Sequence, residues 1–179
     1  QRQMCIRDSP NVYIPGQFEN PDNPKAHIYH TAAEILEQVG GDIDGFCSGV
    51  GTGGTISGIG EVLKKQNPSI KIWAVEPENA AILSGGSVGT HLQMGIGDGL
   101  IPDNLNTTIY EHICVISDDE AIKTAKRLAS EEGIMCGISS GSNVAAAIKL
   151  ARRLGKGKTV VTVLPDTGER YFSTELFDD

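Results

Sequence analysis

The sequence predicts an α/β fold in which a mainly parallel, open sheet is flanked by helices. Three observations lead to this prediction. Short apolar runs alternate along the chain with segments of helical periodicity. The pattern over residues 43–77 indicates a strand, a loop, a helix and a second strand, and such a unit makes its two strands parallel. Turns rich in glycine and hydroxyl side chains follow three of the predicted strands, which is typical of the binding edge of an open sheet.

The elements of the first half follow from local patterns. A helix is predicted over 26–39, because apolar residues recur at helical spacing until Gly40 and Gly41 end it. A buried strand is predicted over 43–49, a helix over 55–66 and a second strand over 70–77. The segment 84–102 is rich in glycine, has little charge and shows no periodicity, and long segments of this kind often carry function.

The second half continues the alternation. A strand is predicted over 112–117, and a helix over 118–132 in which Ser117 and Glu120 have the spacing of a capping box. A short strand over 134–138, a helix over 142–154 and a strand over 158–165 complete the pattern. The chain of 179 residues, 39% of them hydrophobic, is long enough for one good core.

Composition narrows the class of function. The formal net charge is -8 and no cluster of Lys and Arg is longer than a pair, which argues against binding to nucleic acid or to an anionic membrane. The cysteines at 5, 47, 114 and 136 lack metal or redox spacing, and the last three lie in apolar runs, so free buried thiols and a reducing cytoplasm are predicted. Neither a secretory signal nor an apolar membrane span is found. Chemistry on small molecules is the class that remains.

The glycine loop "SGVGTGGTISGIG" at 48–60 is the main candidate for a binding site. Backbone N–H groups at a helix N-terminus are unpaired and lie at the positive end of the helix dipole, so they suit a phosphate, and Thr52 and Thr55 add hydroxyl donors. A Walker A loop is excluded because no G-K-[ST] follows. Two alternatives remain from spacing alone: a dinucleotide site with Glu76 on the ribose, because residues 49–54 spell G-x-G-x-x-G, or a purely structural turn.

Two further turns resemble the glycine loop in composition. "GISSGS" at 137–142 and "PDTGERY" at 165–171 also follow predicted strands. The carboxyl ends of parallel strands lie at one edge of a sheet, so the three turns are expected to converge there. Each turn alone is more simply explained as a helix cap than as a binding site, and the three together favour a site.

Five blocks of the sequence resemble one known family. "GVGTGGTISGIG", "AVEPENAAILSGG", "GIGDGLIPDNL", "EEGIMCGISSGS" and "GERYFSTELF" are similar to the C-terminal half of cysteine synthases (O-acetylserine sulfhydrylases). These are pyridoxal 5'-phosphate (PLP) enzymes of the tryptophan-synthase-β-like group, fold type II. The resemblance covers residues 18–177. It implies a PLP-dependent β-replacement that forms L-cysteine from O-acetylserine and sulfide with release of acetate.

The resemblance also implies roles for individual residues. A serine on the pyridine nitrogen corresponds to Ser139, with Ser140 beside it, and a neutral hydroxyl there favours β-elimination and replacement over transamination. The remaining positions form two groups: the PLP phosphate would be bound by Gly51, Thr52, Gly53, Gly54 and Thr55, and the substrate would be flanked by Gly95, Ile96, Gly97 and Asp98. Gly53 is expected to be glycine so that the phosphate can approach the backbone closely.

The resemblance implies that some parts of the enzyme lie outside this chain. The Schiff-base lysine of the family is expected upstream, so no catalytic residue is assigned here, and the chain is interpreted as a partial chain that would be inactive alone. Residues 1–17 are interpreted as an irregular, non-native segment, and 18–179 as the C-terminal part of the synthase-like domain. The family also implies a homodimer in the cytoplasm that docks the C-terminus of serine acetyltransferase.

Some positions depart from the family or have simpler explanations. Many members have a small residue at the position of Asp98 and serine at that of Asp166, which leaves a cystathionine β-synthase-like substrate as an alternative. His27 and His30 lie three apart on a predicted helix without acidic or Cys partners nearby, so both are interpreted as surface histidines and no metal site is predicted.

Overall fold

The computed structural model describes residues 11–177 of the chain. Its helical segments are α2 (Asp22–Ala26), the π-helical turn η1 (His27–Thr31), α3 (Ala32–Val39), α4 (Gly54–Gln66), the short η2 (Glu78–Ala80), α5 (Asp118–Glu132), α6 (Ile138–Leu154) and the short η3 (Gly168–Tyr171). Its strands are β1 (Gly45–Gly49), β2 (Lys71–Pro77), β3 (His112–Ile116) and β4 (Val160–Thr162).

The four strands form one parallel sheet in the order β3-β2-β1-β4. Cys47 pairs with Trp73, and Trp73 pairs in turn with His112, so β1, β2 and β3 run in register across the middle of the sheet. This confirms the predicted strand–helix–strand unit and the predicted α/β class. The carboxyl ends of all four strands therefore lie at the same edge.

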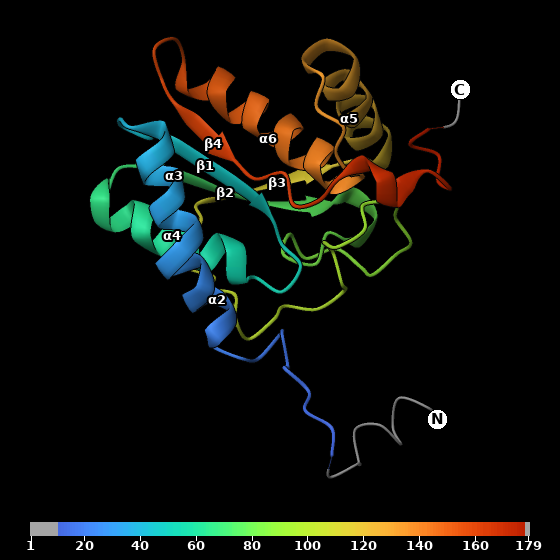
Figure 1. Ribbon diagram of the computed structural model, residues 1–179, viewed down its shortest axis with the longest axis horizontal. Helices are drawn as coiled ribbons and strands as arrows, with labels where there is room; N and C mark the ends of the chain where they lie inside the picture. The colour runs from blue at the N-terminus through green and yellow to red at the C-terminus, as the bar shows by residue number, and fades with distance from the viewer. Residues whose placement is uncertain (1–10, 178–179) are drawn as a thin grey trace.

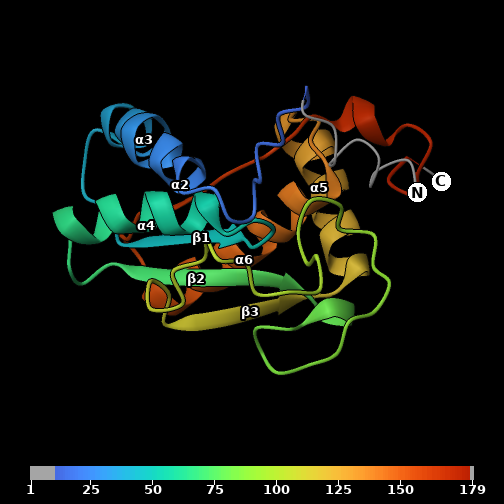
Figure 2. The ribbon, with the colours of Figure 1, turned by 90° about the horizontal axis from the view of Figure 1, so that it is seen from below.

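Helices cover both faces of the sheet, as Figures 1 and 2 show: α2, α3 and α4 lie on one side, and α5 and α6 on the other. Alternate residues of each strand supply the two cores, because successive side chains point to opposite faces. The core under α5 and α6 includes Cys47, Trp73, Val75, Cys114 and Ile116. The core under α3 and α4 includes Phe46, Ile56, Ile59, Ile72 and Ala74.

The first helical region begins four residues before the predicted start at residue 26. Asn20 accepts a hydrogen bond from the Asp22 N–H through its side chain, at 2.9 Å, and so turns the chain into α2. Pro24 lies within the first turn, where its missing N–H costs nothing. The end is as predicted, because Gly40 adopts φ +63° and closes α3 at Val39.

Helix α5 begins where the sequence predicts, but only half of the capping box forms. The Ser117 hydroxyl accepts a hydrogen bond from the Glu120 N–H at 3.3 Å. The Glu120 carboxylate does not return to the backbone of Ser117. It pairs instead with Nζ of Lys149 on α6, at 2.8 Å, and so joins the two helices.

The predicted strand over 134–138 is wrong. Cys136 makes only an isolated bridge with Thr167, and Ile138 already opens α6, four residues before the predicted helix start at 142. Ile134 and Met135 are 43% and 44% exposed, whereas Ile138 is buried. A short apolar run does not distinguish a strand from the first turn of a buried helix, and here Ile138 reaches the core from the helix.

The last strand is shorter than the predicted range of 158–165. Before it, the Thr159 N–H donates to the Asp44 carboxylate at 2.9 Å. After Thr162, the carbonyl of Val163 accepts the side-chain amide of Asn143 at 2.8 Å, so the chain leaves the ladder there. Competition from side chains thus limits β4 to three residues.

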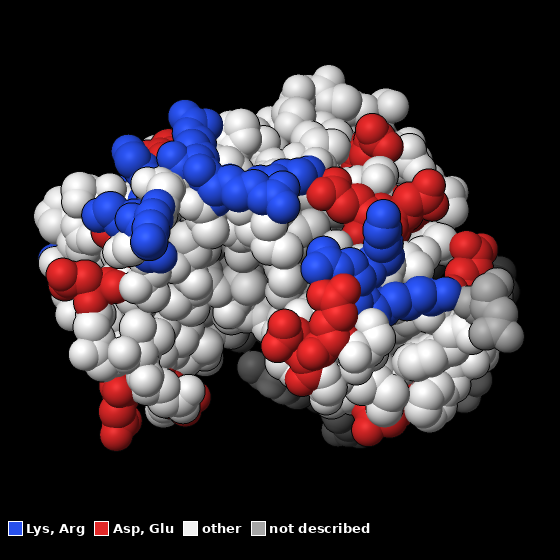
Figure 3. Space-filling view, turned by 90° about the horizontal axis from the view of Figure 1, so that it is seen from above, with Lys and Arg blue, Asp and Glu red and all other residues white. Residues whose placement is uncertain are grey.

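The face formed by α5 and α6 carries both signs of charge. Basic side chains gather over one part of this face and mix with acidic ones over the rest (Figure 3). Arg152 and Arg153 lie in the last turn of α6, and the Arg153 guanidinium lies 5.7 Å from the centre of the Trp73 ring. Trp73 is buried and belongs to the core under α5 and α6.

The cysteines that the structure describes are free and buried, as predicted: Cys47, Cys114 and Cys136. Burial raises the pKa of the Cys47 thiol to about 12. Cys5 lies outside the described residues. Among residues 11–177, no helix is both long and apolar enough to cross a membrane.

Candidate functional site

The predicted glycine loop lies at the carboxyl end of β1 and at the N-terminus of α4. Gly53 is the N-cap of α4, with φ +80°, and has no side chain to cap the helix; the first N–H, that of Gly54, makes only a long contact of 3.5 Å with the Thr52 hydroxyl oxygen. Because the first N–H groups of a helix have no partner within the helix, the start of α4 offers uncapped donors at the positive end of its dipole. α4 has 13 residues, long enough for this effect to develop.

A cavity of about 700 Å³ opens in front of this helix end. It lies at the carboxyl edge of the sheet, beside the ends of β1 and β4, where ligands of open α/β sheets bind. Its lining residues are Gln17, Phe18, His27, Thr31, Ser48, Gly49, Gly51, Thr52, Gly53, Thr55, Gly95, Ile96, Asp98, Asn143, Val163, Leu164 and Pro165.

Most of the predicted site residues meet at this cavity. Of the predicted phosphate-binding residues, all line it except Gly54, and of the predicted substrate-flanking residues, all line it except Gly97. Ser139 is not among the lining residues. It lies in the first turn of α6 and is buried, as is Ser140. Of the three predicted turns, 137–142 contributes no lining residue, and 165–171 contributes only Pro165.

The two threonines of the loop are held by the segment that precedes α3. The Asn23 amide donates to the Thr52 hydroxyl oxygen at 2.9 Å, which leaves the hydroxyl proton of Thr52 free to be donated. Nε2 of His27 lies 3.2 Å from the Thr55 hydroxyl oxygen. Both hydroxyls therefore have a fixed position at the helix end, and the donors that they and the helix N–H groups provide suit an anionic oxygen group such as a phosphate.

The glycines of the loop are required by the packing of the chain itself. A Cβ on Gly53 would lie 2.7 Å from Cβ of Leu105 and 2.8 Å from its Cα. A Cβ on Gly51 or Gly54 would overlap the Gly95 carbonyl or the Asn23 side chain, respectively. The sequence analysis expected glycine at position 53 so that a phosphate can approach the backbone. The structure gives a different reason: Leu105 already occupies the space where a Cβ of residue 53 would lie.

The segment 95–98 packs directly against the glycine loop, and both line the cavity. The Gly97 N–H donates to the Val50 carbonyl at 3.0 Å, and the Gly97 carbonyl lies 3.2 Å from Nε2 of His91. Gly97 has φ +71° and packs against Pro77, which explains why it is behind the lining residues. Asp98 places an exposed carboxylate at the cavity, where a small residue was expected from the family pattern.

Asn143 is a site residue that the sequence analysis missed. It is buried on α6 and lines the cavity between the ends of β1 and β4. Its Oδ1 accepts the Gly49 N–H at 2.7 Å, and its Nδ2 donates to the Val163 carbonyl at 2.8 Å. The Asn143 side chain thus supplies hydrogen bonds to both strand ends where β1 and β4 no longer bond to each other. An Asn within an apolar helical pattern gave no local signal of these partners, which are 94 and 20 residues away.

The turn that carries Ser139 and Ser140 contains a buried hydroxyl without a hydrogen bond. The Ser140 Oγ has no partner, and the same holds for Oδ1 of Asp166, whose other oxygen accepts the Tyr171 hydroxyl at 2.6 Å. Buried polar groups are normally bonded, so an unpaired hydroxyl here fits a turn that meets a polar group of a ligand. Hydroxyl donors of this kind suit the pyridine nitrogen of PLP.

The interpretation of His27 as a surface residue is wrong, whereas His30 is exposed as predicted. His27 is half-buried, lines the cavity and lies between Thr31 and Thr55, with its Nδ1 3.0 Å from the Thr31 hydroxyl. The signal was not local, because Thr55 is 28 residues away. Within the described part of the chain, no group of three or more His, Cys, Asp or Glu side chains is placed to hold a metal ion.

Acidification should weaken the fold through His27. Burial lowers the pKa of His27 below its usual value of 6.5. The unfolded chain then binds a proton more readily than the folded chain, so stability is full above the unfolded pKa and falls as pH drops below it. We expect His27→Gln to flatten this dependence and His30→Gln to retain it, in chemical unfolding followed between neutral and mildly acidic pH. Parallel curves for the parent and His27→Gln would contradict the expectation.

The dinucleotide alternative loses its ribose partner. Glu76 is 2% exposed, and its carboxylate accepts the N–H groups of Leu83 and Ser84 at 2.8 and 3.0 Å as well as the Ser84 hydroxyl. These bonds fasten the start of the long loop after β2. The carboxylate is therefore occupied and does not line the cavity.

The fold and the cavity define an α/β enzyme class in which the phosphate of a cofactor is bound at the N-terminus of a helix that follows a strand. A family model described as "Pyridoxal-phosphate dependent enzyme" matches residues 2–166. The chain belongs to this family, and PLP is the cofactor that the family implies. The uncapped helix end, the two oriented threonine hydroxyls and the unpaired hydroxyl of Ser140 fit this group.

Individual relatives show which members of the family this chain is similar to. A protein named cysteine synthase in Staphylococcus aureus is 53% identical over 177 residues, which are 97% of this chain and 57% of that protein. The structure of O-acetylserine sulfhydrylase isoform 3 from Entamoeba histolytica is 44% identical with a TM-score of 0.91, over 98% of this chain and 53% of that one. An O-acetylserine dependent cystathionine β-synthase from Helicobacter pylori is 38% identical with a TM-score of 0.92, over 98% of this chain and 57% of that one.

The comparisons confirm the predicted PLP fold type II and the resemblance to cysteine synthases. The chain spans little more than half the length of these relatives. The cavity lining includes no lysine among the described residues. The division of the chain at residue 17 stays a prediction, although Gln17 and Phe18 both line the cavity.

Proposed function

We propose that the protein carrying this chain forms L-cysteine from O-acetylserine and sulfide, with release of acetate, by PLP-dependent β-replacement. The observation that carries the proposal is the 53% identity to cysteine synthase over nearly the whole chain. The start of α4 supports it, because open helix N–H groups and two positioned threonine hydroxyls lie at the cavity and suit a phosphate. The chain contributes the cofactor cradle and one wall of the substrate cavity.

Each part of the cavity has a distinct task in this proposal. Thr52, Thr55 and the first N–H groups of α4 would hold the cofactor phosphate, and Ser139 would donate to its pyridine nitrogen. When bound, PLP withdraws electrons from the amino-acid substrate, which makes loss of the α-proton and of the β-substituent feasible. The segment 95–98 would flank the substrate, and the buried Asn143 keeps the ends of β1 and β4 apart so that the cavity stays open.

The test uses the whole protein with PLP and O-acetylserine. We expect sulfide to give L-cysteine and one equivalent of acetate, both measured directly. A second reaction with homocysteine in place of sulfide tests the cystathionine β-synthase-like alternative. Cystathionine as the preferred product would replace the proposed sulfur donor, and absence of acetate in both reactions would exclude O-acetylserine as the substrate.

Ser139→Ala should slow the reaction while leaving PLP bound. One hydrogen bond to a charged or strongly polar group contributes about 1.5–3 kcal/mol, so turnover should fall by about 10- to 100-fold at saturating PLP. The rate of O-acetylserine consumption measures the effect. Ser140→Ala is measured beside it, because Ser140 lies in the same turn and its unpaired hydroxyl is the other candidate donor to the pyridine nitrogen. If Ser140→Ala were slow and Ser139→Ala normal, the role would belong to Ser140.

The whole protein is further proposed to be a homodimer in the cytoplasm that docks the C-terminus of serine acetyltransferase. The resemblance to cysteine synthases supports both partners, and the three free thiols support a reducing compartment. Sedimentation of the whole protein and binding of a peptide with the acetyltransferase C-terminal sequence test these partners separately. A monomer, or a peptide that does not bind, would remove the corresponding partner.

A further inference from the structure

Gln93 is a fully buried amide in a segment that has neither helix nor strand. Its side chain is 0% exposed, and it lies two residues before Gly95, where the cavity wall 95–98 begins. A buried amide is costly unless its donors and acceptor are bonded. The contacts of Gln93 therefore show what this part of the loop is fastened to.

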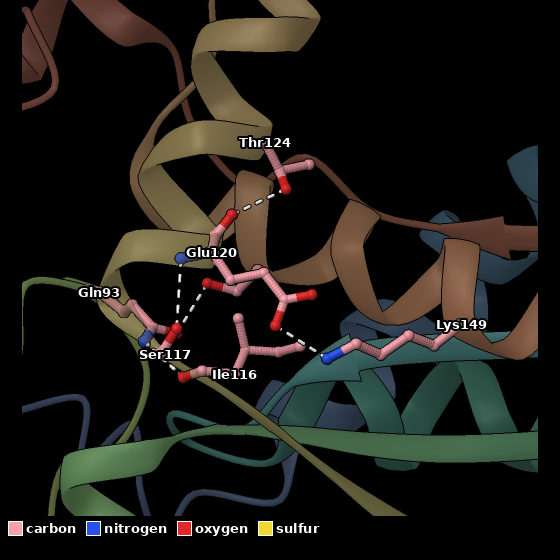
Figure 4. Close-up of polar contacts among 7 residues, drawn as sticks. Gln93, Ile116, Ser117, Glu120, Thr124 and Lys149 are labelled. Carbon is pink, nitrogen blue, oxygen red and sulfur yellow. Dashed lines mark hydrogen bonds and ion pairs between the residues drawn. The ribbon is translucent and has the colours of Figure 1, made fainter.

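The Gln93 amide bonds to three different elements. Its Nε2 donates to the carbonyl of Ile116 at the end of β3, at 2.9 Å, and to Oδ1 of Asp118 at the start of α5, at 2.8 Å. Its Oε1 accepts the hydroxyl of Ser142 on α6 at 2.7 Å. Figure 4 shows Gln93 reaching the end of β3 at Ile116, beside Ser117.

The partners of Gln93 are themselves held by hydrogen bonds and an ion pair. The second carboxylate oxygen of Asp118 accepts the Leu92 N–H at 2.9 Å, so Asp118 holds two successive residues of the loop. Asp118 is the first residue of α5, where a negative charge is favoured by the helix dipole. The Glu120–Lys149 pair joins α5 to α6, as Figure 4 also shows.

The cavity wall is anchored at several points, among them the buried side chain of Ile96 and the Gly97 carbonyl, which lies 3.2 Å from Nε2 of His91. Gly97 donates to the Val50 carbonyl, whereas Met94, between Gln93 and the wall, is 55% exposed. The position of 95–98 therefore depends on the contacts of Ile96 and Gly97 within the segment and on Gln93 just before it. Through Ser142, Gln93 also reaches the first turns of α6, the helix that carries Ser139.

We propose that Gln93 is a positioning residue that holds the substrate-flanking segment 95–98 in register with the start of α6. It touches neither the cavity nor the phosphate loop, so its effect is on the substrate and not on retention of the cofactor. The inference rests on the proposed function for the identity of the substrate. The geometry of the anchor does not depend on it.

The test compares four variants in the whole, PLP-loaded protein. Gln93→Met keeps the shape and removes all three bonds. Gln93→Glu keeps the acceptor for Ser142 but places its carboxylate against that of Asp118. In the double variant Gln93→Glu with Asp118→Asn, the new amide at 118 can donate to the new carboxylate at 93, so the hydrogen bond is restored with donor and acceptor exchanged. Thr124→Val is the control, because it removes a buried hydrogen bond to the Glu120 carbonyl on the same helix, drawn in Figure 4, without touching the loop.

Two measurements distinguish positioning from simple loss of stability. For Gln93→Met we expect kcat/KM for O-acetylserine to fall by about 10- to 100-fold, with a raised KM, while PLP affinity stays unchanged. Backbone hydrogen exchange over 94–99 should become faster in Gln93→Met but not in Thr124→Val. The double variant should recover part of the activity that Gln93→Glu loses, which a variant that fails to fold cannot imitate.

The outcomes separate this proposal from the proposed function. Equal exchange over 94–99 in the parent and Gln93→Met, or equal kinetic loss in Gln93→Met and Thr124→Val, would overturn the positioning role. A third outcome is also informative: exchange over 94–99 could be faster in Gln93→Met while the parent protein does not consume O-acetylserine. That result would support the anchor and overturn the proposed substrate.

Discussion

Replacing Thr52 and Thr55 together by valine is expected to weaken PLP binding by at least about 100-fold, because each removes a charge-assisted hydrogen bond of about 1.5–3 kcal/mol to the phosphate. Valine keeps the shape and the β-branching of threonine but also removes the contacts with Asn23 and His27, so chemical unfolding is measured beside PLP binding. The uncapped N–H groups of α4 would remain, and binding should therefore be weakened without being abolished. Equilibrium dialysis or fluorescence titration of the whole protein with PLP measures the change.

The matched control for this variant is Thr162→Val. Thr162 lies in β4, and its hydroxyl donates to the Cys47 carbonyl at 2.7 Å without lining the cavity. The Thr162→Val variant should lower the free energy of unfolding and leave the PLP affinity as in the parent. An unchanged PLP affinity in the double variant Thr52→Val with Thr55→Val would mean that the cavity at α4 is not the phosphate site.

Gly53→Ala is expected to destabilise the fold by about 2–5 kcal/mol, the sum of a left-handed backbone cost of about 1–2 kcal/mol and an overpacking cost of about 1–3 kcal/mol. The backbone has φ +80°, and the new Cβ would lie 2.7 Å from Leu105. Chemical unfolding of the whole protein without PLP measures the loss.

Gly40→Ala isolates the two contributions. Gly40 also has positive φ, at +63°, but nothing lies within 4 Å of the position of its Cβ. It should therefore cost only the backbone contribution of about 1–2 kcal/mol. Equal losses for the two variants would show that Leu105 moves aside without cost, and the close contact would not be the reason for glycine at position 53.

Local signals were sufficient for most of the fold. The unit from β1 to β2, the start of α5 and the end of α3 follow from periodicity, a cap and a glycine that lie within a few residues of one another. The error at 134–138 and the short β4 have a different origin. The apolar run at 134–138 fits a strand and the start of a buried helix equally well, and the end of β4 depends on Asn143, which is 20 residues away in sequence.

The candidate site shows the same division. The glycine loop and the segment 95–98 could be predicted from composition and from the family resemblance, and the cavity brings them together. His27, Asn143 and Gln93 could not be predicted, because each acts through hydrogen bonds to residues 20 to 94 positions away. Gly53 could be selected from the sequence, but the reason for it, the backbone of Leu105, is visible only in the fold.

The buried thiols have a consequence for a protein proposed to make cysteine. With a pKa of about 12, the Cys47 thiol is ionised in only about one molecule in 10⁵ at neutral pH, and the thiolate is the form that attacks a disulfide. Burial raises the pKa of Cys114 and Cys136 as well. Cystine formed from the product by oxidation therefore meets almost no thiolate at Cys47, and burial disfavours the thiolate at Cys114 and Cys136 in the same direction. The three thiols in the described part of the chain are therefore poor sites for mixed disulfides in a pool of free thiol and disulfide.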